Sequence, residues 1–517
     1  MRAGRQVAAL IVLALLASGC PAKHPQGQPS PTTTATASPS GTLTIAYPAE
    51  PATLDPFAPA GDTPATRDIA RLLMPGLYKV EPSGARERWL LASEPVESNG
   101  PPFSVTVALR DDATWSNGTP ITVDDLRFTW QLAARRQIAR AGYDQIARIV
   151  TLTPKRARIE FRAPFRRWRD LFSAGLGVLP AHALSTPRRI ASLSSSWPVS
   201  GGPFVLKAWH SGLDMIFEPN PHAWAGTPHL QRLRVVFVPD SLGALTLFRD
   251  GAVDALAPYQ APDWVRGVTG PGASVTTDTG ETWMGIVMNT RSKLLGDVQI
   301  RHALADSLDR GLLVRGLVQG EGAALNAIPP SASSPFATYG NLGRARTTLS
   351  SDGWSGSGIR TKRGTKLSFT IAVADSDGLG QVLARAITYQ AARAGIDVQA
   401  VSLPVDEIMS NWLTGSRFDV AILEWRDPPQ GAVRARFASG GTLPNVARWN
   451  DQTLNRDLNA EDAGAPDASQ ARLAAVLPVL PLATLAVSLA SSVRAHGLIA
   501  NAEADGPFWN AEQWSMS

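Results

Sequence analysis

The feature that most constrains the fold is a helix, a glycine and a strand in immediate succession. At residues 378–394, apolar side chains recur at three- and four-residue spacing, so they share one face of a helix. Gly395 then ends this pattern, and an extended run follows at 398–403. A helix that leads directly into a strand is a unit of mixed α/β folds, in which helices cover a sheet. We therefore predict an α/β fold.

The same alternation of helical and extended patterns continues along the chain, without a repeat of fixed period. The runs typical of strands lie at 43–47, 103–109, 157–161, 233–238, 283–288, 367–372, 398–403 and 419–423. The runs typical of helices lie at 122–134, 242–248, 298–308, 378–394 and 471–477.

Length and charge narrow the class of protein. With 517 residues, the chain has room for about three domains of ordinary size. Its 49 Lys and Arg stand against 44 Asp and Glu, a balance too even to indicate a nucleic-acid partner. The single Cys excludes an internal disulfide.

The N-terminus has the order of an export signal. Arg2 and Arg5 precede an apolar run at 7–17, which is too short for a bilayer core of about 20 residues. Leu16-Ala17-Ser18-Gly19-Cys20 resembles the lipobox of bacterial lipoproteins, so we predict a signal peptide at 1–19 and a lipid on Cys20. A plain signal peptide with an incidental Cys, or an uncleaved anchor, stays open as an alternative. Residues 20–40 are rich in Pro, Thr and Ser and predict an unfolded tether.

Catalytic and metal-binding motifs are missing from the sequence. It contains no Gly-Lys-Ser/Thr phosphate loop, no His-Glu-x-x-His and no Gly-x-Ser-x-Gly. The seven His are scattered, and the paired carboxylates are adjacent rather than opposed. We therefore predict no enzyme activity, no cofactor and no metal site. The 15 Trp, against six Tyr, favour apolar cores and a surface that captures a solute.

Several motifs, taken in order, resemble those of the family 5 extracellular solute-binding proteins, which serve ABC importers of oligopeptides, dipeptides and nickel. The matching stretches are Leu54-Asp55-Pro56, 109–120, 123–130, Gly201-Gly202-Pro203-Phe204, 219–224, Asp250-Gly251-Ala252-Val253-Asp254, 297–310, Gly320, Pro329-Pro330, and Arg417-Phe418-Asp419-Val420 before Trp425. The resemblance covers about residues 41–515.

This resemblance implies a two-lobed fold of the periplasmic-binding-protein type, class II-like, in which the lobes close over the ligand like a Venus flytrap. It places lobe I at 41–80, 190–285 and 450–517, a subdomain inserted in lobe I at 81–189, and lobe II at 286–449. Closure would be a population shift driven by contacts that are made only in the closed state.

The resemblance also suggests ligand-binding residues. In peptide-binding relatives an Asp shortly after a Trp pairs with the α-ammonium of the peptide, and here Asp427 follows Trp425 by two positions, one fewer than usual. Arg426, Arg434 and Arg436 would suit a carboxylate or another anion. Trp283, Met284 and Asp62 resemble ligand-facing positions. For these three the alternative is a place in the core or on the surface, and for the arginines it is the solvated surface. The alternative for Asp427 is that it corresponds to the Asp-Pro that follows the amine-binding Asp in relatives.

The function implied is that of an exported protein, lipid-anchored to the outer face of the cytoplasmic membrane. It would capture a peptide or peptide-like solute as a monomer and deliver it to a permease with its cytoplasmic ATPase. Alternatives on the same fold are a sensor or adhesion lipoprotein, or a cargo such as a metal chelate or an oligosaccharide. A surface hydrolase would need a nucleophile and base that the sequence does not provide.

Overall fold

The computed structural model describes most of the chain from Gly41 onward. The described residues are 41–61, 63–136, 142–173, 175–259, 267–268, 272–280, 282–317, 324–328, 334–375, 377–404, 407–408, 418–425, 437, 447–465 and 467–517. The predicted signal peptide, Cys20 and the tether lie outside them.

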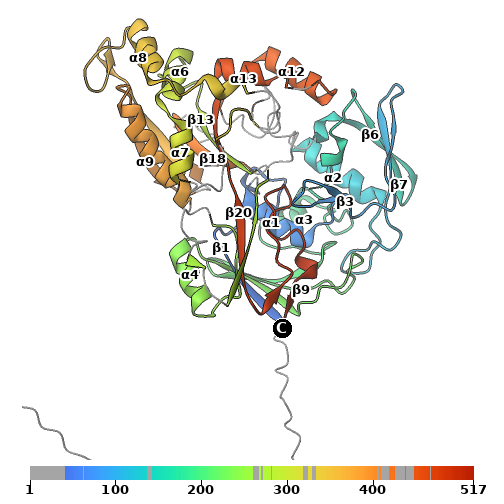
Figure 1. Ribbon diagram of the computed structural model, residues 1–517. Helices are drawn as coiled ribbons and strands as arrows, with labels where there is room; N and C mark the ends of the chain where they lie inside the picture. Colours follow the sequence, from blue (N-terminus) through green and yellow to red (C-terminus); the bar gives the residue numbers. More distant parts are fainter. Residues whose placement is uncertain are drawn as a thin grey trace, which may run out of the picture. The chain divides into compact units, whose positions relative to one another are not determined.

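A mixed sheet, here called the first sheet, holds the N-terminus of the body (Figure 1). Its strand order is β12-β20-β11-β1-β10-β9-β8. The strands are β1 (Thr42–Tyr47), β8 (Phe204–His210), β9 (Asp214–Pro219), β10 (Arg232–Phe237), β11 (Ala255–Leu256), β12 (Ala273–Asp278) and β20 (Val487–Ser492). β1 is parallel to β10 and β11, whereas β20 is antiparallel to β11 and β12. Helix α1 (Pro64–Leu73) contacts β8, and α4 (Ser241–Arg249) contacts β11.

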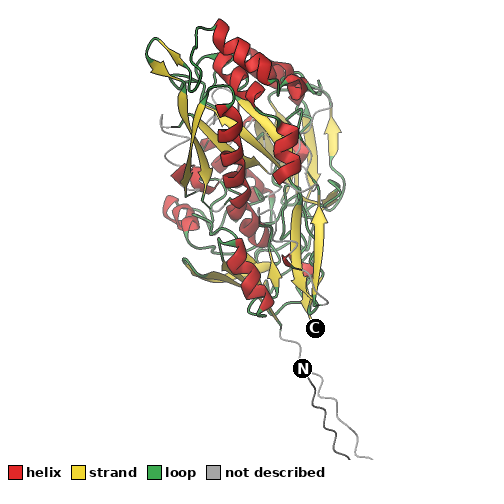
Figure 2. Ribbon diagram, turned by 60° about the vertical axis from the view of Figure 1, so that its left-hand side comes forward, coloured by secondary structure: helices red, strands yellow, loops and turns green. Residues whose placement is uncertain are grey.

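The second sheet has the order β17-β16-β18-β13-β19. Its strands are β13 (Trp283–Met288), β16 (Ser368–Ala374), β17 (Asp397–Leu403), β18 (Val420–Trp425) and β19 (Val479–Thr484). The long helix α9 (Gly378–Ala392) packs against β16, β17 and β18, and Figure 2 shows helices running beside the strands. The other helices of this region are α6 (Val298–Ser307), α7 (Arg310–Leu317), α8 (Leu342–Ser351), α12 (Gln452–Asp462) and α13 (Gln470–Val476).

Smaller sheets complete the body. A four-stranded sheet, in the order β4-β5-β7-β6, is formed by β4 (Val96–Ser98), β5 (Ser104–Ala108), β6 (Ile146–Thr153) and β7 (Arg156–Phe161). Helix α2 (Val123–Arg135) lies between β5 and β6 in the sequence, and α3 (Pro187–Ala191) comes after β7. Three two-stranded pairs are β2 (Tyr78–Val80) with β3 (Arg86–Arg88), β14 (Thr361–Lys362) with β15 (Thr365–Lys366), and β21 (Ala495–His496) with β22 (Ser515–Met516).

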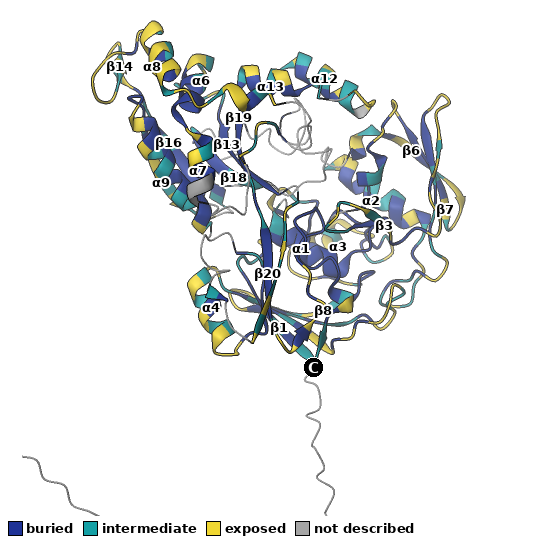
Figure 3. Cartoon of the chain, in the orientation of Figure 1, coloured by how far each residue is buried: buried dark blue, intermediate teal, exposed yellow. Residues whose placement is uncertain are grey.

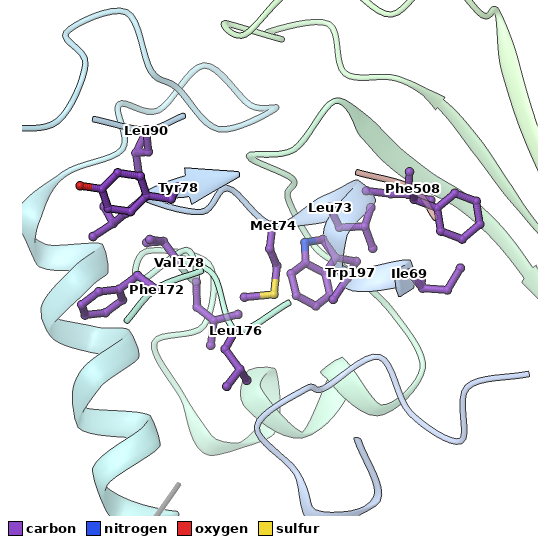
Figure 4. Packing of buried hydrophobic residues seen from close by; sticks show 14 of the residues in the cluster. Ile69, Leu73, Met74, Tyr78, Leu90, Phe172, Leu176, Val178, Trp197 and Phe508 are labelled. Atoms are coloured by element: carbon purple, nitrogen blue, oxygen red, sulfur yellow. The ribbon is translucent and has the colours of Figure 1, made fainter. Parts of the chain in front are cut away.

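Burial separates the cores of the two large sheets. Leu43, Ile45 and Tyr47 of β1 pack into the first core, whereas Ala46 between them faces a small cluster beneath α4. This alternation is what the two faces of a strand require. β1, β11, β13, β19 and β20 are largely buried, whereas the outer sides of α4 and α8 are exposed, as Figure 3 shows. Figure 4 shows part of the first core, where Leu73 and Met74 lie beside Trp197.

The elements predicted from periodicity are confirmed, because the first and last residues of each predicted run differ by at most two from those of an observed strand or helix. The predicted helix start at residue 122 is also confirmed. The hydroxyl of Thr122 caps α2, and Asp125 accepts a hydrogen bond from the backbone of Thr122 in return.

The lobe boundaries stay a prediction, and the structure differs from them in one respect. Residues 450–484 are assigned above to lobe I, yet β19 pairs with β13, and α12 and α13 contribute Leu454 and Leu473 to the core of the second sheet. That core spans Trp283–Leu485. We therefore propose that lobe II includes residues 283–285 and 450–485.

A buried carboxylate in β9 provides a test of the first sheet. Burial would raise the pKa of Asp214, but hydrogen bonds from His210 (2.7 Å) and Arg234 (2.5 Å) outweigh it, so the pKa is lower than usual. A lowered pKa means that the carboxylate stabilises the fold above its unfolded pKa of about 3.9, and that this is lost as the pH falls through the folded pKa. We expect Asp214→Asn to lower the free energy of unfolding by about 1–2 kcal/mol at pH 7, because a charge-assisted hydrogen bond is replaced. The difference from wild type should shrink below about pH 4.

Urea unfolding at pH 7 and at pH 3.5 measures both effects. The exposed Asp250, changed to Asn, is the matched control and should leave the free energy of unfolding nearly unchanged at both values. An Asp214→Asn deficit that is equally large at both pH values would contradict the assignment.

Candidate functional site

The candidate site is defined by the ends of the strands in the two large sheets. β1, β10 and β11 are parallel and end at the same edge of the first sheet, where β12 also ends. In the second sheet β16, β17 and β18 run parallel, and both β18 and β19 are antiparallel to β13. The carboxyl ends of β16 to β19 therefore lie at the edge where β13 begins. Ligands of open α/β sheets bind at carboxyl edges of this kind.

Two crossings connect these carboxyl edges. One is the segment from β12 to β13, and the other is the two-residue link from β19 to β20 (Figure 1). The backbone N–H of Leu485 donates to the carbonyl of Thr282 over 2.9 Å, so the crossings are paired with each other. The carboxyl edges of both sheets thus lie at the same pair of crossings, and we take the residues that follow the strand ends as the candidate site.

The edge of the first sheet is held by hydrogen bonds between successive strand ends. The N–H of Val238 donates to the carbonyl of Tyr47 over 2.9 Å, and the hydroxyl of Tyr259 donates to the carbonyl of Val238 over 2.8 Å. Burial, reinforced by Asp240, raises the pKa of Tyr259 far above its usual value, so its hydroxyl stays protonated and remains a donor. This edge is therefore positioned before any ligand arrives.

The loop after β1 is shaped by the Asp of the Leu54-Asp55-Pro56 motif. Asp55 is buried, and its Oδ1 accepts from the N–H of Phe57 over 3.0 Å. Its Oδ2 accepts from the guanidinium of Arg136 over 2.6 Å. Arg136 is the C-cap of α2 and directly follows its last residue, Arg135. Asp55 therefore joins the first sheet to α2, which is a structural role.

Other residues of the motifs join segments in the same way. Asn220 donates to the carbonyl of Gly202 over 2.8 Å, and Asp254 accepts from the N–H of Thr44 over 3.0 Å. The guanidinium of Arg301 donates to the carbonyl of Val476 over 2.6 Å, and Arg310 donates to that of Pro481 over 3.2 Å.

The structure places some of the predicted ligand residues. Trp283 and Met284 open β13, are nearly or fully buried at 2% and 0% exposure, and belong to the core of the second sheet. The backbone of Trp425 ends β18 directly opposite Trp283. The strand register therefore brings Trp283 and Trp425 together at the edge. Asp62, Arg426, Asp427, Arg434 and Arg436 lie outside the described residues, and the ligand role of every one of these residues remains a proposal.

Most of the described tryptophans are buried in the interior of the protein and do not line the candidate site. Among the described side chains, the buried ones are Trp89, Trp115, Trp168, Trp197, Trp283, Trp354, Trp509 and Trp514. In the described part of the chain, no three His, Cys, Asp or Glu side chains are grouped so that they could hold a metal ion. Across the same residues, no helix combines the length and the apolar character that crossing a membrane requires.

The comparisons with known proteins agree with this architecture. Residues 87–438 match the family model of the bacterial extracellular solute-binding proteins, family 5 Middle. The oligopeptide-binding protein AppA of Bacillus subtilis is 23% identical over 442 residues, which cover 80% of this chain and 79% of AppA.

Solved structures share the fold over almost the whole chain. The periplasmic EDTA-binding protein EppA superposes with a TM-score of 0.82 at 21% identity, covering 93% of this chain and 97% of EppA. AppA in complex with a nonapeptide gives 0.81 at 18% identity, covering 93% and 100%. NikZ from Campylobacter jejuni in complex with Ni(L-His) gives 0.81 at 20% identity, covering 92% and 100%.

The fold is therefore that of a two-lobed α/β binding protein of the periplasmic type. The chain belongs to family 5 of the bacterial extracellular solute-binding proteins, which are not enzymes.

The ion pair between Asp55 and Arg136 generates a prediction. We expect Arg136→Met to lower the free energy of unfolding by about 2 kcal/mol, because the buried carboxylate of Asp55 loses its cation. Asp55→Asn should also destabilise the protein, and the double variant should lose less than the sum of the two. Urea unfolding of the four proteins gives the coupling energy, expected to be about 1–2 kcal/mol. Strict additivity would show that the pair does not join the loop to α2.

Proposed function

We propose that this protein is the substrate-binding subunit of an ABC importer and captures a peptide or peptide-like solute between its two lobes. The observation that carries the proposal is the meeting of both carboxyl edges at one pair of hydrogen-bonded crossings. A solute held there would contact both lobes at once, and contacts with both lobes favour the closed state. Membership in family 5 supports the same conclusion.

The cargo is proposed from chemistry and from relatives. AppA is an oligopeptide-binding protein and was solved with a nonapeptide, which favours a peptide. EppA binds EDTA and NikZ binds Ni(L-His) on the same fold, so a chelate is the second candidate. Peptides, EDTA and histidine all carry both amine nitrogen and carboxylate groups. Asp427 would pair with an ammonium of the cargo, and Arg426 or Arg434 with a carboxylate.

The partners follow from the same proposal. A lipid on Cys20 would hold the body on the outer face of the cytoplasmic membrane, and residues 21–40 would let it move there as a monomer. A permease with its cytoplasmic ATPase would receive the cargo. The sensor or adhesion alternative predicts ligand binding without uptake. Uptake of labelled peptide by cells with and without the gene separates the two.

The most direct test of the binding function is mass spectrometry of small molecules that copurify with the protein from its native host. A peptide that copurifies, and that raises the melting temperature when it is added back, supports the proposal. A chelate in its place supports the second candidate. A protein that neither retains nor binds any member of a broad peptide and chelate panel would contradict both.

The role of Asp427 can be measured separately. We expect Asp427→Ala to weaken binding of a peptide with a free N-terminus about tenfold or more, because the ammonium loses a charged hydrogen-bond partner. Binding of the same peptide with an acetylated N-terminus should be weak in the wild type and unchanged by the substitution. Asp375, an exposed carboxylate just after β16, is the matched control as Asp375→Ala. Isothermal titration calorimetry gives the affinities, and equal affinity of Asp427→Ala and wild type would remove Asp427 from the site.

The anchor is tested with Cys20. We expect Cys20→Ser to abolish incorporation of labelled palmitate and to prevent cleavage of the signal peptide, because the thiol is the group that is acylated. Ser18→Ala should leave labelling intact. Metabolic labelling followed by immunoprecipitation measures both variants. Full palmitate labelling of Cys20→Ser would contradict the proposal.

A further inference from the structure

A segment near the C-terminus follows the crossing from β12 to β13. We call residues 500–503 the strap. The N–H of Ala500 donates to the hydroxyl of Thr276 over 2.9 Å, and the N–H of Ala502 donates to the carboxylate of Asp278 over 2.7 Å. The hydroxyl of Thr282 donates to the carbonyl of Ala502 over 2.6 Å. The strap is thus bonded to the crossing both before and after Gly280.

Gly280 lies beneath the strap as well. A Cβ added to Gly280 would lie 2.6 Å from Oε1 of Glu503 and 3.0 Å from the Cβ of Ala502. Thr276 and Asp278 are two apart in β12 and therefore share one face of this strand. The strap contacts this face, and beyond the strand it lies against Gly280 and Thr282. The absence of a side chain at Gly280 therefore lets the strap pack closely against the backbone, and this packing restricts the backbone dihedral angles of Gly280.

The strap is itself fixed to the first-sheet side of the molecule. Asn501 is fully buried and donates to the carbonyl of Val80 over 2.8 Å. The N–H of Val80 donates to the carboxylate of Asp505 over 2.8 Å. Further along, Arg71 of α1 donates to the carbonyl of Trp509 over 2.9 Å. Thr276, Asp278 and Thr282 are therefore held to β2 through the strap, and the chain that follows the strap contacts α1.

Directly after Thr282 the chain leaves the strap and enters the second sheet. Trp283 begins β13 and belongs to the second core. Its pairing with β19 shifts register between Met284 and Gly285, whose partners are Ala483 and Pro481. A bulge of this kind interrupts the ladder and increases the local bend. The first irregular point after the strap is therefore at residues 283–285, opposite 481–485.

We infer that the strap sets the pivot of lobe movement at residues 283–285 and 481–485, and that Thr282 is the positioning residue that anchors it. The inference rests on the proposed function, because it assumes that the two lobes move relative to each other. On this account Gly280 is not the hinge, although glycine in a crossing suggests one. Thr282 directly precedes Trp283, the first residue of β13. The bond from Thr282 to Ala502 therefore also positions the start of β13, and with it the edge of the second sheet, relative to the first sheet.

The substitution that isolates the bond is Thr282→Val, which keeps the shape of the side chain and removes only the donor. The carbonyl of Ala502, a fully buried residue, would then lose its partner. Thr282→Ser keeps the hydroxyl and should behave as wild type. Thr276→Val removes the bond from Ala500 to β12 and leaves both bonds of Ala502 in place, so it should not loosen the pivot.

The experiment is double electron–electron resonance on the full chain without added ligand, which makes it independent of the cargo. Cys20→Ser removes the only native thiol, and spin labels are placed at Leu242→Cys in α4 and Tyr389→Cys in α9, both highly exposed positions on opposite sides of the crossings. We expect a single narrow distance peak in the parent, in Thr282→Ser and in Thr276→Val, and loss of the narrow peak in Thr282→Val. Thr388→Val, which removes a threonine-to-alanine-carbonyl bond inside α9, is the matched control and should keep the peak.

The outcomes separate cleanly. A narrow peak in Thr282→Val, or a Thr282→Ser protein as broad as Thr282→Val, overturns the assignment of Thr282. Equal broadening in Thr276→Val overturns the position of the pivot. If Thr282→Val does not fold, Asp278→Ala, which releases the N–H of Ala502, provides the second route and should also broaden the peak. Failure of every peptide to bind would count against the proposed function and would leave these distances unaffected.

Discussion

The hydrogen bond from Leu485 to Thr282 is the contact on which the arrangement of the two large sheets depends. The bond joins the two crossings, β12 to β13 and β19 to β20. Within the described residues, the chain passes between the two large sheets only at these crossings. Because the crossings are hydrogen-bonded to each other, a movement of one is coupled to the other. Buried backbone groups at such a point must find partners, and here each crossing supplies the partner of the other. The strap then holds one of them to β2.

Buried polar side chains do much of the remaining connecting. Arg301 and Arg310 are buried, and their guanidinium groups donate to carbonyls that lie far away in the sequence. Arginine suits this task because it offers five donors in a fixed plane and stays charged. Burial lowers the pKa of both residues, which is the electrostatic cost of removing them from water. Several residues that carry the resemblance to family 5 are therefore structural, because they join segments that are distant in the sequence.

The strongly periodic elements could be predicted from the sequence, and the weakly periodic ones could not. α9 was evident because its apolar residues share one face, and the start of α2 because Thr122 and Asp125 form a capping box. α1 was missed although its N-cap Thr63 and the Pro64 that follows it are a helix-start signal. Its buried side includes Arg67, Asp68 and Arg71, whose burial makes sense only with tertiary partners such as the hydroxyl of Tyr47, 2.5 Å from Asp68. The strap was missed for the same reason, since its bond to Thr282 joins residues 220 positions apart.

The sequence by itself determined the α/β class, the positions of the main strands and helices, and the resemblance to the family. These depend on local periodicity, on caps and on motifs that are contiguous in the chain. Only the tertiary structure decided that β19 joins the second sheet, that Gly280 is packed beneath Glu503, and that Trp283 stands opposite Trp425. Each of these depends on which distant segments pair, and pairing is chosen by the burial of whole faces and the satisfaction of backbone donors, which no short stretch of sequence records.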